Sequence, residues 1–270
     1  NSERTIAENS IVKVYHSTFN NQYIQDTEPG AAIYISINEK INLDNSNPIE
    51  IFGCTFVQCQ ADKGSAVYIK SVESHRLFNA EQYSFVGGKK GWSNSELDST
   101  YGGGICIEAN FLIVNIKKCI FDGNYDIGRG SGICFIFDLT DAINDDTNND
   151  NDYSMIIEDC TFVKNEASDS GGAIHISIIN GEPFKPIEIC NCIFHSNSAF
   201  QNETPKDLPE IGGAISIEYD CSSSSSLLDS NAEFIVRVIN CDFTSNTAYN
   251  LAGVFYISIL DDEPSKPIEI

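Results

Sequence analysis

Basic residues are scarce in this sequence. Among its 270 residues, 16 are Lys or Arg and 39 are Asp or Glu, so the formal net charge at pH 7 is −23. Because nucleic acids and anionic membranes attract basic proteins, this balance argues against both as partners. No apolar run approaches the roughly 20 residues that a membrane helix needs. We therefore expect no nucleic-acid partner and no membrane insertion by this segment.

The spacings typical of metal sites are also missing. The ten cysteines form no C-x-x-C pair, and Cys190-x-Cys192 does not have a zinc-site spacing. Residues 138–152 are rich in Asp and Asn, whose oxygens are good calcium ligands, but they lack the glycine and the terminal glutamate of an EF-hand loop. We therefore predict no cofactor and no metal, and interpret 138–152 as a solvated loop.

One pattern returns seven times along the chain. Its core, C-x-F-x-x-N, is intact at 119–124, 160–165, 192–197 and 241–246, whereas 17–22, 54–59 and 83–88 keep the phenylalanine and lose the asparagine. A pair of alternating apolar residues precedes each core. A cluster of small residues then leads into an apolar strand, as in GGAIHISI at 171–178. Repetition at this period, with strands only, indicates a β-solenoid.

Alternation within the repeat defines the strands. Every second side chain of a strand points to the same face, so pairs such as Met155/Ile157, Phe162 with its cysteine, and Ile174/Ile176 point inward. Three short strands per rung predict an all-β fold, a parallel β-helix of about seven rungs. We expect one domain over 1–270, a segment of a longer chain, with rungs starting near residues 11, 49, 77, 112, 155, 187, 235 and 268.

Stacking of the rungs places like residues in columns, which we expect to form structural ladders. The cysteine column is interpreted as buried thiols, because cysteine is among the most buried residues. Asparagine tolerates the left-handed region, so its column is expected at a tight corner with stacked amides, and glycine pairs at a second corner. The three ladders are Cys119, Cys160, Cys192 and Cys241; Phe121, Phe162, Phe194 and Phe243; and Asn124, Asn165, Asn197 and Asn246.

Two cysteines fall in a different, outward column. Cys106 and Cys134 lie on neighbouring rungs, so they are candidates for a surface disulfide, with two exposed thiols as the alternative. The same column also holds Tyr34, Tyr68, His175, Ser216 and Tyr256.

Long loops interrupt the repeat and are the expected sites of recognition. Trp92 and Tyr101, in the loop 89–101, are the candidate recognition aromatics. Asn202 begins the one Asn-x-Ser/Thr sequence, Asn202-Glu203-Thr204, and is a candidate glycosylation site. The other variable loops are predicted at 38–48, 138–154, 198–210 and 218–234.

The succession of F-x-x-N and G-G-A-[ILV] resembles the repeat of the polymorphic outer membrane proteins. FVKN with GGAI at 162–174 and FHSN with GGAI at 194–215 match it most cleanly. The resemblance implies a right-handed parallel β-helix that serves as the exposed stalk or passenger of an adhesin. It also implies an extracellular or cell-surface location.

Three functions therefore stand as hypotheses. The first is a non-enzymatic, adhesin-like stalk or passenger that binds a protein or glycan on a neighbouring surface. The second is a structural segment of an extracellular fibre or coat, whose partners are copies of itself. The third is a polysaccharide-cleaving enzyme, because pectin lyases share this architecture. The sequence disfavours the enzyme: it has only four arginines, and no rung presents adjacent outward aspartates.

Overall fold

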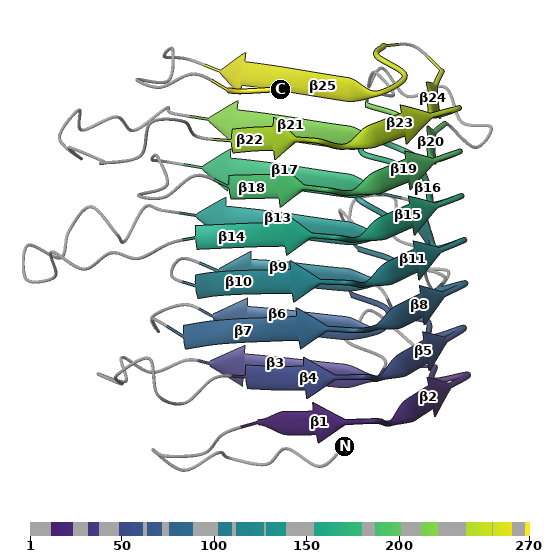
Figure 1. Cartoon of the computed structure of the whole chain (residues 1–270), viewed down its shortest axis with the longest axis vertical. Helices are drawn as coiled ribbons and strands as arrows, with labels where there is room; N and C mark the ends of the chain where they lie inside the picture. The colour runs from purple at the N-terminus through teal and green to yellow at the C-terminus, as the bar shows by residue number, and fades with distance from the viewer. Residues whose placement is uncertain are drawn as a thin grey trace, which may run out of the picture.

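The chain forms a column of stacked rungs, shown in the computed structural model (Figure 1). Among the residues that the structure describes there is no helix, and all paired strands run parallel, so the predicted right-handed parallel β-helix is confirmed. No helix in this part is long and apolar enough to cross a membrane. The structure describes residues 12–23, 32–37, 49–61, 64–71, 76–88, 102–109, 112–126, 128–138, 154–179, 187–200, 212–220, 236–249, 251–260 and 268–270.

Three sheets of seven strands run along the column. Sheet A holds the strands that open each rung, and rungs are numbered 1 to 7 from them: β1 (Lys13–Tyr15), β4 (Ile49–Phe52), β7 (Arg76–Glu81), β10 (Leu112–Lys117), β14 (Ser154–Glu158), β18 (Ile187–Cys190) and β22 (Val236–Ile239). Sheet B holds β2 (Thr18–Asn20), β5 (Thr55–Val57), β8 (Ser84–Val86), β11 (Ile120–Asp122), β15 (Thr161–Val163), β19 (Ile193–His195) and β23 (Asp242–Thr244). Sheet D holds β3 (Ile33–Ile37), β6 (Val67–Ser71), β9 (Ile105–Ala109), β13 (Ile133–Asp138), β17 (Ile174–Ile179), β21 (Ile215–Asp220) and β25 (Phe255–Leu260).

A fourth, smaller sheet was not predicted. Sheet C lies in rungs 4 to 7, and its strands follow directly on the asparagine of each intact motif. Two residues are too few to show a period, so the sequence pattern assigned this stretch to a corner. The strands are β12 (Tyr125–Asp126), β16 (Glu166–Ala167), β20 (Ser198–Ala199) and β24 (Thr247–Ala248).

The corners use positive φ angles, but not at the four asparagines of the ladder, Asn124, Asn165, Asn197 and Asn246. The left-handed residue is the one before the asparagine, such as Lys164 at 52° and Ser196 at 55°, so the expectation that the asparagine itself is left-handed is wrong. At the corner before sheet D a left-handed glycine stands in rungs 2 to 6, and Ala252, with a φ of 52°, stands there in rung 7. Gly171 has a φ of 63°, and a Cβ there would lie 2.2 Å from the carbonyl oxygen of Ile174.

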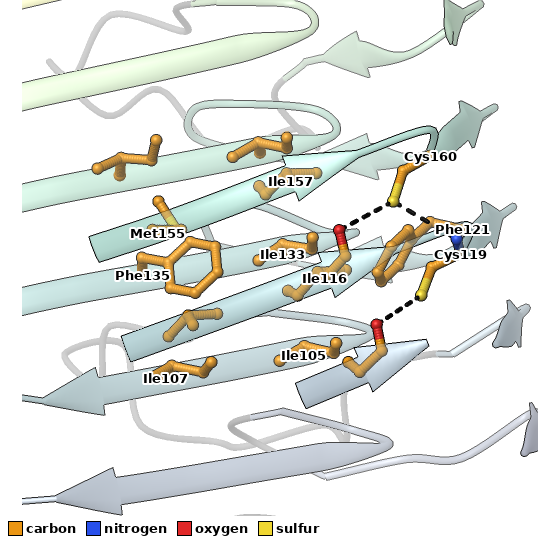
Figure 2. Packing of buried hydrophobic residues seen from close by; sticks show 14 of the residues in the cluster. Ile105, Ile107, Ile116, Cys119, Phe121, Ile133, Phe135, Met155, Ile157 and Cys160 are labelled. Carbon is orange, nitrogen blue, oxygen red and sulfur yellow. Dashed lines mark hydrogen bonds between the residues drawn. The ribbon is translucent and has the colours of Figure 1, made fainter. Parts of the chain in front are cut away.

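The core fills the space between the sheets. Isoleucines of sheets A and D face one another there, and Phe121 lies beside them on sheet B (Figure 2). The phenylalanines form one stack from Phe19 to Phe243, with neighbouring ring centroids 4.7 to 5.0 Å apart. The stack runs through all seven rungs of the β-helix. The remaining columns of side chains are arranged around it.

Candidate functional site

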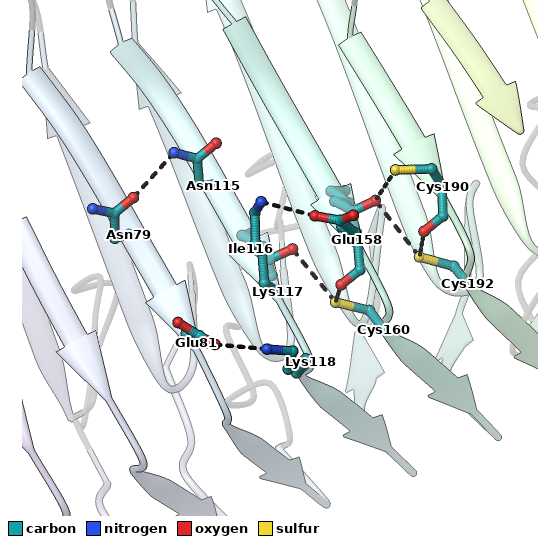
Figure 3. A network of polar contacts seen from close by, with 11 residues as sticks. Asn79, Glu81, Asn115, Ile116, Lys117, Lys118, Glu158, Cys160, Cys190 and Cys192 are labelled. Carbon is teal, nitrogen blue, oxygen red and sulfur yellow. Dashed lines mark hydrogen bonds and ion pairs between the residues drawn. The ribbon is translucent and has the colours of Figure 1, made fainter.

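The cysteine column lies at the corner between sheets A and B. The Sγ of Cys160 donates to the carbonyl oxygens of Glu158 at 3.2 Å and Ile116 at 3.6 Å, and accepts from the backbone N–H of Cys119 at 3.4 Å (Figures 2 and 3). Cys119, Cys160 and Cys192 are buried, whereas Cys241 is half-buried. Burial raises the pKa of the Cys160 thiol, so it stays protonated. These thiols hydrogen-bond backbone and are poor nucleophiles.

The asparagine column forms a chain of amide hydrogen bonds. The Nδ2 of Asn165 donates to Phe121 O at 2.9 Å and to Asn197 Oδ1 at 3.0 Å, and its Oδ1 accepts from the Nδ2 and the backbone N–H of Asn124. In rung 2 Cys59 occupies this position, and its Sγ donates to Phe19 O at 3.9 Å. The spacing of CTFVQC at 54–59 aligns Cys59 with the asparagines of the intact motifs.

The outward column of sheet D is mostly covered. Tyr34 in rung 1 is 51% exposed, but Cys106 and Cys134 are buried, so the prediction of a surface pair is wrong. Both are thiols in the structure and no disulfide joins them. The other buried members are Tyr68, His175 and Ser216.

The glycine corner explains this burial. Its backbone turns back over the outer face of sheet D. A Cβ on Gly130 would lie 2.9 Å from the Cβ of His175, and a Cβ on Gly102 would lie 2.9 Å from the Cβ of Cys106. Strand alternation assigns a side chain to the outer face, but it does not say whether another segment covers that face.

Arg129 lies at this corner and forms an ion-pair network. Its Nε contacts Asp169 Oδ2 and its Nη1 contacts Glu218 Oε2, both at 2.6 Å. His175 Nδ1 lies 3.3 Å from the Oγ of Ser170, whereas its Nε2 has no hydrogen-bond partner in the described part of the chain. Burial, with a contribution from Arg129, lowers the pKa of His175 to about 3, so the imidazole is neutral.

The chemistry open to this column is limited by its burial. A thiol, an imidazole and a hydroxyl follow one another on Cys134, His175 and Ser216 of neighbouring strands, but all three are fully buried. Within the described ranges, no group of three or more His, Cys, Asp or Glu side chains is arranged to hold a metal ion. The column is therefore a packed polar layer closed to a substrate from solution.

The outer face of sheet A is different, because it carries a groove open to solvent. We name it the sheet A groove. It has a volume of about 460 Å³ and lies across β1, β4, β7 and β10. In it the Nδ2 of Asn115 donates to the Oδ1 of Asn79 at 3.1 Å (Figure 3). The lining residues are Tyr15, Glu50, Ile51, Phe52, Asn79, Ala80, Glu81, Asn115 and Lys117.

The charges around the sheet A groove are paired. Lys13 contacts Glu50 at 2.9 Å, Lys118 contacts Glu81 at 3.0 Å, and Lys117 contacts Glu158 at 2.8 Å. Glu50 also accepts a short hydrogen bond from the hydroxyl of Tyr15, which together with Lys13 lowers the pKa of this carboxyl. No site was predicted on this face, although Asn79 and Asn115 occupy matching positions of neighbouring rungs.

Several predicted site residues lie outside the described ranges. These are Trp92, Tyr101 and Asn202, together with residues 139–152 of the acidic loop. Three predicted loops need a correction at their ends, because β13 extends to Asp138 and β14 begins at Ser154, β20 covers Ser198–Ala199, and β21 extends to Asp220. Tyr219 is buried and Glu218 contacts Arg129, so neither belongs to a dispensable loop.

Together these features define a class of protein: a right-handed parallel β-helix built from short repeats, with ladders inside. Residues 159–177 match the Chlamydia polymorphic membrane protein repeat, which confirms the resemblance in that segment. This is the repeat of an outer-membrane surface family, and a cell-surface location fits it. No curated protein and no solved structure matches the chain.

Proposed function

We propose that the chain is a non-enzymatic, extracellular or cell-surface β-helix that acts as the stalk or passenger of an adhesin. The observation that carries the proposal is where the matched repeat lies in the fold. Within 159–177, Cys160, Phe162, Asn165 and Ile174 are all buried in the ladders. The repeat therefore builds the scaffold, and recognition is left to loops and outer faces, as in other solenoids.

The polar groups of the described residues support a non-enzymatic role. The thiols of Cys119, Cys160 and Cys192 are buried with hydrogen bonds to backbone, and His175 is neutral and covered. The carboxylates beside the sheet A groove are ion-paired with lysines. General acid–base catalysis needs an accessible group that exchanges a proton with substrate, and these groups do not fit that role.

The test is loop trimming with boundaries taken from the strands. Residues 139–153, between β13 and β14, and residues 221–235, between β21 and β22, are each replaced by a short Gly/Ser turn. Beads coated with the parent or a trimmed chain are then applied to cultured epithelial cells. We expect weaker adhesion with an unchanged melting temperature, because the ladder residues are kept.

A matched control replaces the same loops with Gly/Ser segments of equal length. This control separates the loss of recognition side chains from the change of loop length. If both trimmed chains adhere as strongly as the parent, the loops are not the adhesive element. Absence of adhesion by the parent chain itself would contradict the adhesin proposal.

One observation favours the fibre as a second candidate function. The phenylalanines of the inner rungs are fully buried, but Phe19 in rung 1 and Phe243 in rung 7 are only half-buried. A rung of another copy stacked on either ring would bury it. Sedimentation velocity over a wide concentration range tests this: growing end-to-end species support a fibre, and a constant monomer contradicts it.

A further inference from the structure

The sheet A groove has the dimensions of a ligand site. It lies across the four strands β1, β4, β7 and β10, and strands spaced about 4.8 Å apart give it a length of about 14 Å. Its volume of about 460 Å³ falls in the range of small-molecule sites, roughly 300 to 1,000 Å³. The groove is therefore long enough for an extended oligomer that lies along the column.

The charged residues that line the groove are all ion-paired, although the protein is strongly acidic. Three lysines, Lys13, Lys117 and Lys118, are each paired with one of three carboxylates, those of Glu50, Glu158 and Glu81. The formal charges of this cluster sum to zero, although the chain carries −23. The net charge of −23 repels polyanions, whereas a neutral ligand is not repelled.

The groove also offers donors and acceptors side by side. The bond between Asn115 Nδ2 and Asn79 Oδ1 uses one donor and one acceptor of the pair. The Nδ2 of Asn79 remains a donor and the Oδ1 of Asn115 remains an acceptor for a ligand. Hydroxyl groups both donate and accept, so a polyhydroxylated ligand satisfies this arrangement.

Aromatic rings stand at one end of the groove. Tyr15 is 44% exposed, and its ring packs edge-on against Phe52, with centroids 6.4 Å apart. Phe52 in turn packs against His16 at 5.4 Å. Rings held in this way present a rigid apolar surface on which the C–H face of a sugar ring can pack.

We propose that the sheet A groove binds a neutral oligosaccharide. Asn79 and Asn115 hydrogen-bond its hydroxyls, and Tyr15 with Phe52 packs on a ring. A peptide fits less well, because peptides add to sheet edges through free backbone groups, whereas the backbone of β4 and β7 is paired on both sides. The inference deepens the adhesin proposal by naming a ligand class, and rests on it only for the biological setting.

The test is a titration of the whole chain with soluble oligosaccharides, followed by NMR and calorimetry. The neutral probes are cello-, malto-, xylo-, manno-, galacto- and chito-oligosaccharides, and the anionic comparison is oligogalacturonate. We expect at least one neutral probe to bind and to shift backbone resonances of β4, β7 and β10. The double variant Asn79→Ala/Asn115→Ala should weaken that binding about tenfold, and Tyr15→Ala about fivefold.

Asn20→Ala is the matched control. Asn20 is an exposed strand asparagine of rung 1 on sheet B, outside the groove, so its loss should leave binding unchanged. Melting temperatures of all variants show that they fold. The proposal is overturned if no neutral probe binds at millimolar concentration, if only oligogalacturonate binds, or if the folded double variant binds like the parent.

The two proposals can fail separately. If a neutral probe binds in the groove but coated beads do not adhere to cells, the oligosaccharide proposal stands and the adhesin proposal is rejected. Adhesion that disappears on loop trimming, with no probe bound, would retain the adhesin and remove the groove.

Discussion

Rungs 4 to 7 and rungs 1 to 3 have the same strands in sheets A, B and D but differ at one corner. In rungs 4 to 7 an asparagine lies three residues after the phenylalanine, and its amide hydrogen-bonds neighbouring rungs: both neighbours for Asn165, and rung 6 for Asn246. In rungs 1 to 3 the position holds Gln22, Cys59 and Gly88. The backbone bonds survive there: Gln60 N–H donates to Gln22 O, and Tyr125 N–H donates to Gly88 O, both at 2.8 Å.

The comparison separates two contributions to the same fold. Phenylalanine stacking and backbone pairing are common to both regions, so they are sufficient to form a rung. The asparagine adds side-chain hydrogen bonds, and within the described residues the strands of sheet C occur only where it is present. The intact F-x-x-N motif therefore strengthens a corner that the eroded motif still allows.

The largest expected effect concerns the shared element. Phe162 stacks between Phe121 and Phe194 at 4.8 Å, and Phe56 is equally buried in rung 2. Phe162→Ala and Phe56→Ala should each lower the free energy of unfolding by about 3–5 kcal/mol, because each leaves a cavity in a packed stack. Urea unfolding measures both. If Phe56→Ala lowers the free energy of unfolding much less than Phe162→Ala does, the stack does not stabilise rungs 1 to 3 and rungs 4 to 7 to the same extent.

A smaller effect is expected for the element that differs. Asn165→Ala removes four side-chain hydrogen bonds from a buried corner and should cost about 3 kcal/mol. Asn246→Ala is the comparator. Asn246 lies in rung 7, where the corner is half-buried, so this substitution should lower the free energy of unfolding by less. Equal melting temperatures of Asn165→Ala and the parent would show that the amide ladder adds nothing to the corner.

Low pH should destabilise rungs 4 to 7 more than rungs 1 to 3, because the buried His175 lies in rung 5. Its pKa is about 3 in the folded chain and about 6.5 when unfolded, so the unfolded state binds the extra proton between these values. Stability from this group is complete above pH 6.5 and declines as pH falls toward 3, by about 2–3 kcal/mol at pH 4.5.

The measurement compares the parent with His175→Gln by urea unfolding at pH 7 and pH 4.5. Burial raises the pKa of Glu166 and Glu218, which acts with the opposite sign, but both groups are present in both proteins and cancel in the difference. Hydrogen exchange should show the acid-sensitive amides in rungs 4 to 6. An identical loss of stability in the two proteins would remove His175 as the cause.

The smallest effect is a gain. Cys59 is buried at the asparagine position of rung 2, with its Sγ 3.9 Å from Phe19 O. Cys59→Asn would replace this weak contact with an amide donor and should raise the free energy of unfolding by about 0.5–1 kcal/mol. A melting curve resolves the shift. Destabilisation instead would mean that the eroded corner has closed around the smaller side chain.

The interior of the fold could be predicted from the sequence because the repeat places like residues on like positions. The inward pairs of sheet A, such as Val114/Ile116 and Met155/Ile157, are buried, and their period of two is directly visible. Stacking of identical phenylalanines follows once the rungs are aligned. These features depend on spacing alone, which a single sequence contains.

The outer faces could not be predicted in the same way. Cys106 and Cys134 alternate with inward apolar residues, so the pattern predicts that they are exposed, yet the glycine corner covers them. The strand residues Glu218 and Tyr219 read as loop because they open a polar stretch. The path of the chain between strands decides which faces are covered and where a groove opens. The periodic pattern of apolar residues gives no information on that path.

The reach of one arginine changes how the column should unfold. Stacked repeats are commonly treated as a one-dimensional array in which each unit interacts only with its immediate neighbours. Arg129 starts in rung 4 and contacts Asp169 in rung 5 and Glu218 in rung 6, so it couples units that are not adjacent. Rungs 4 to 6 are therefore linked by a contact that a nearest-neighbour description leaves out.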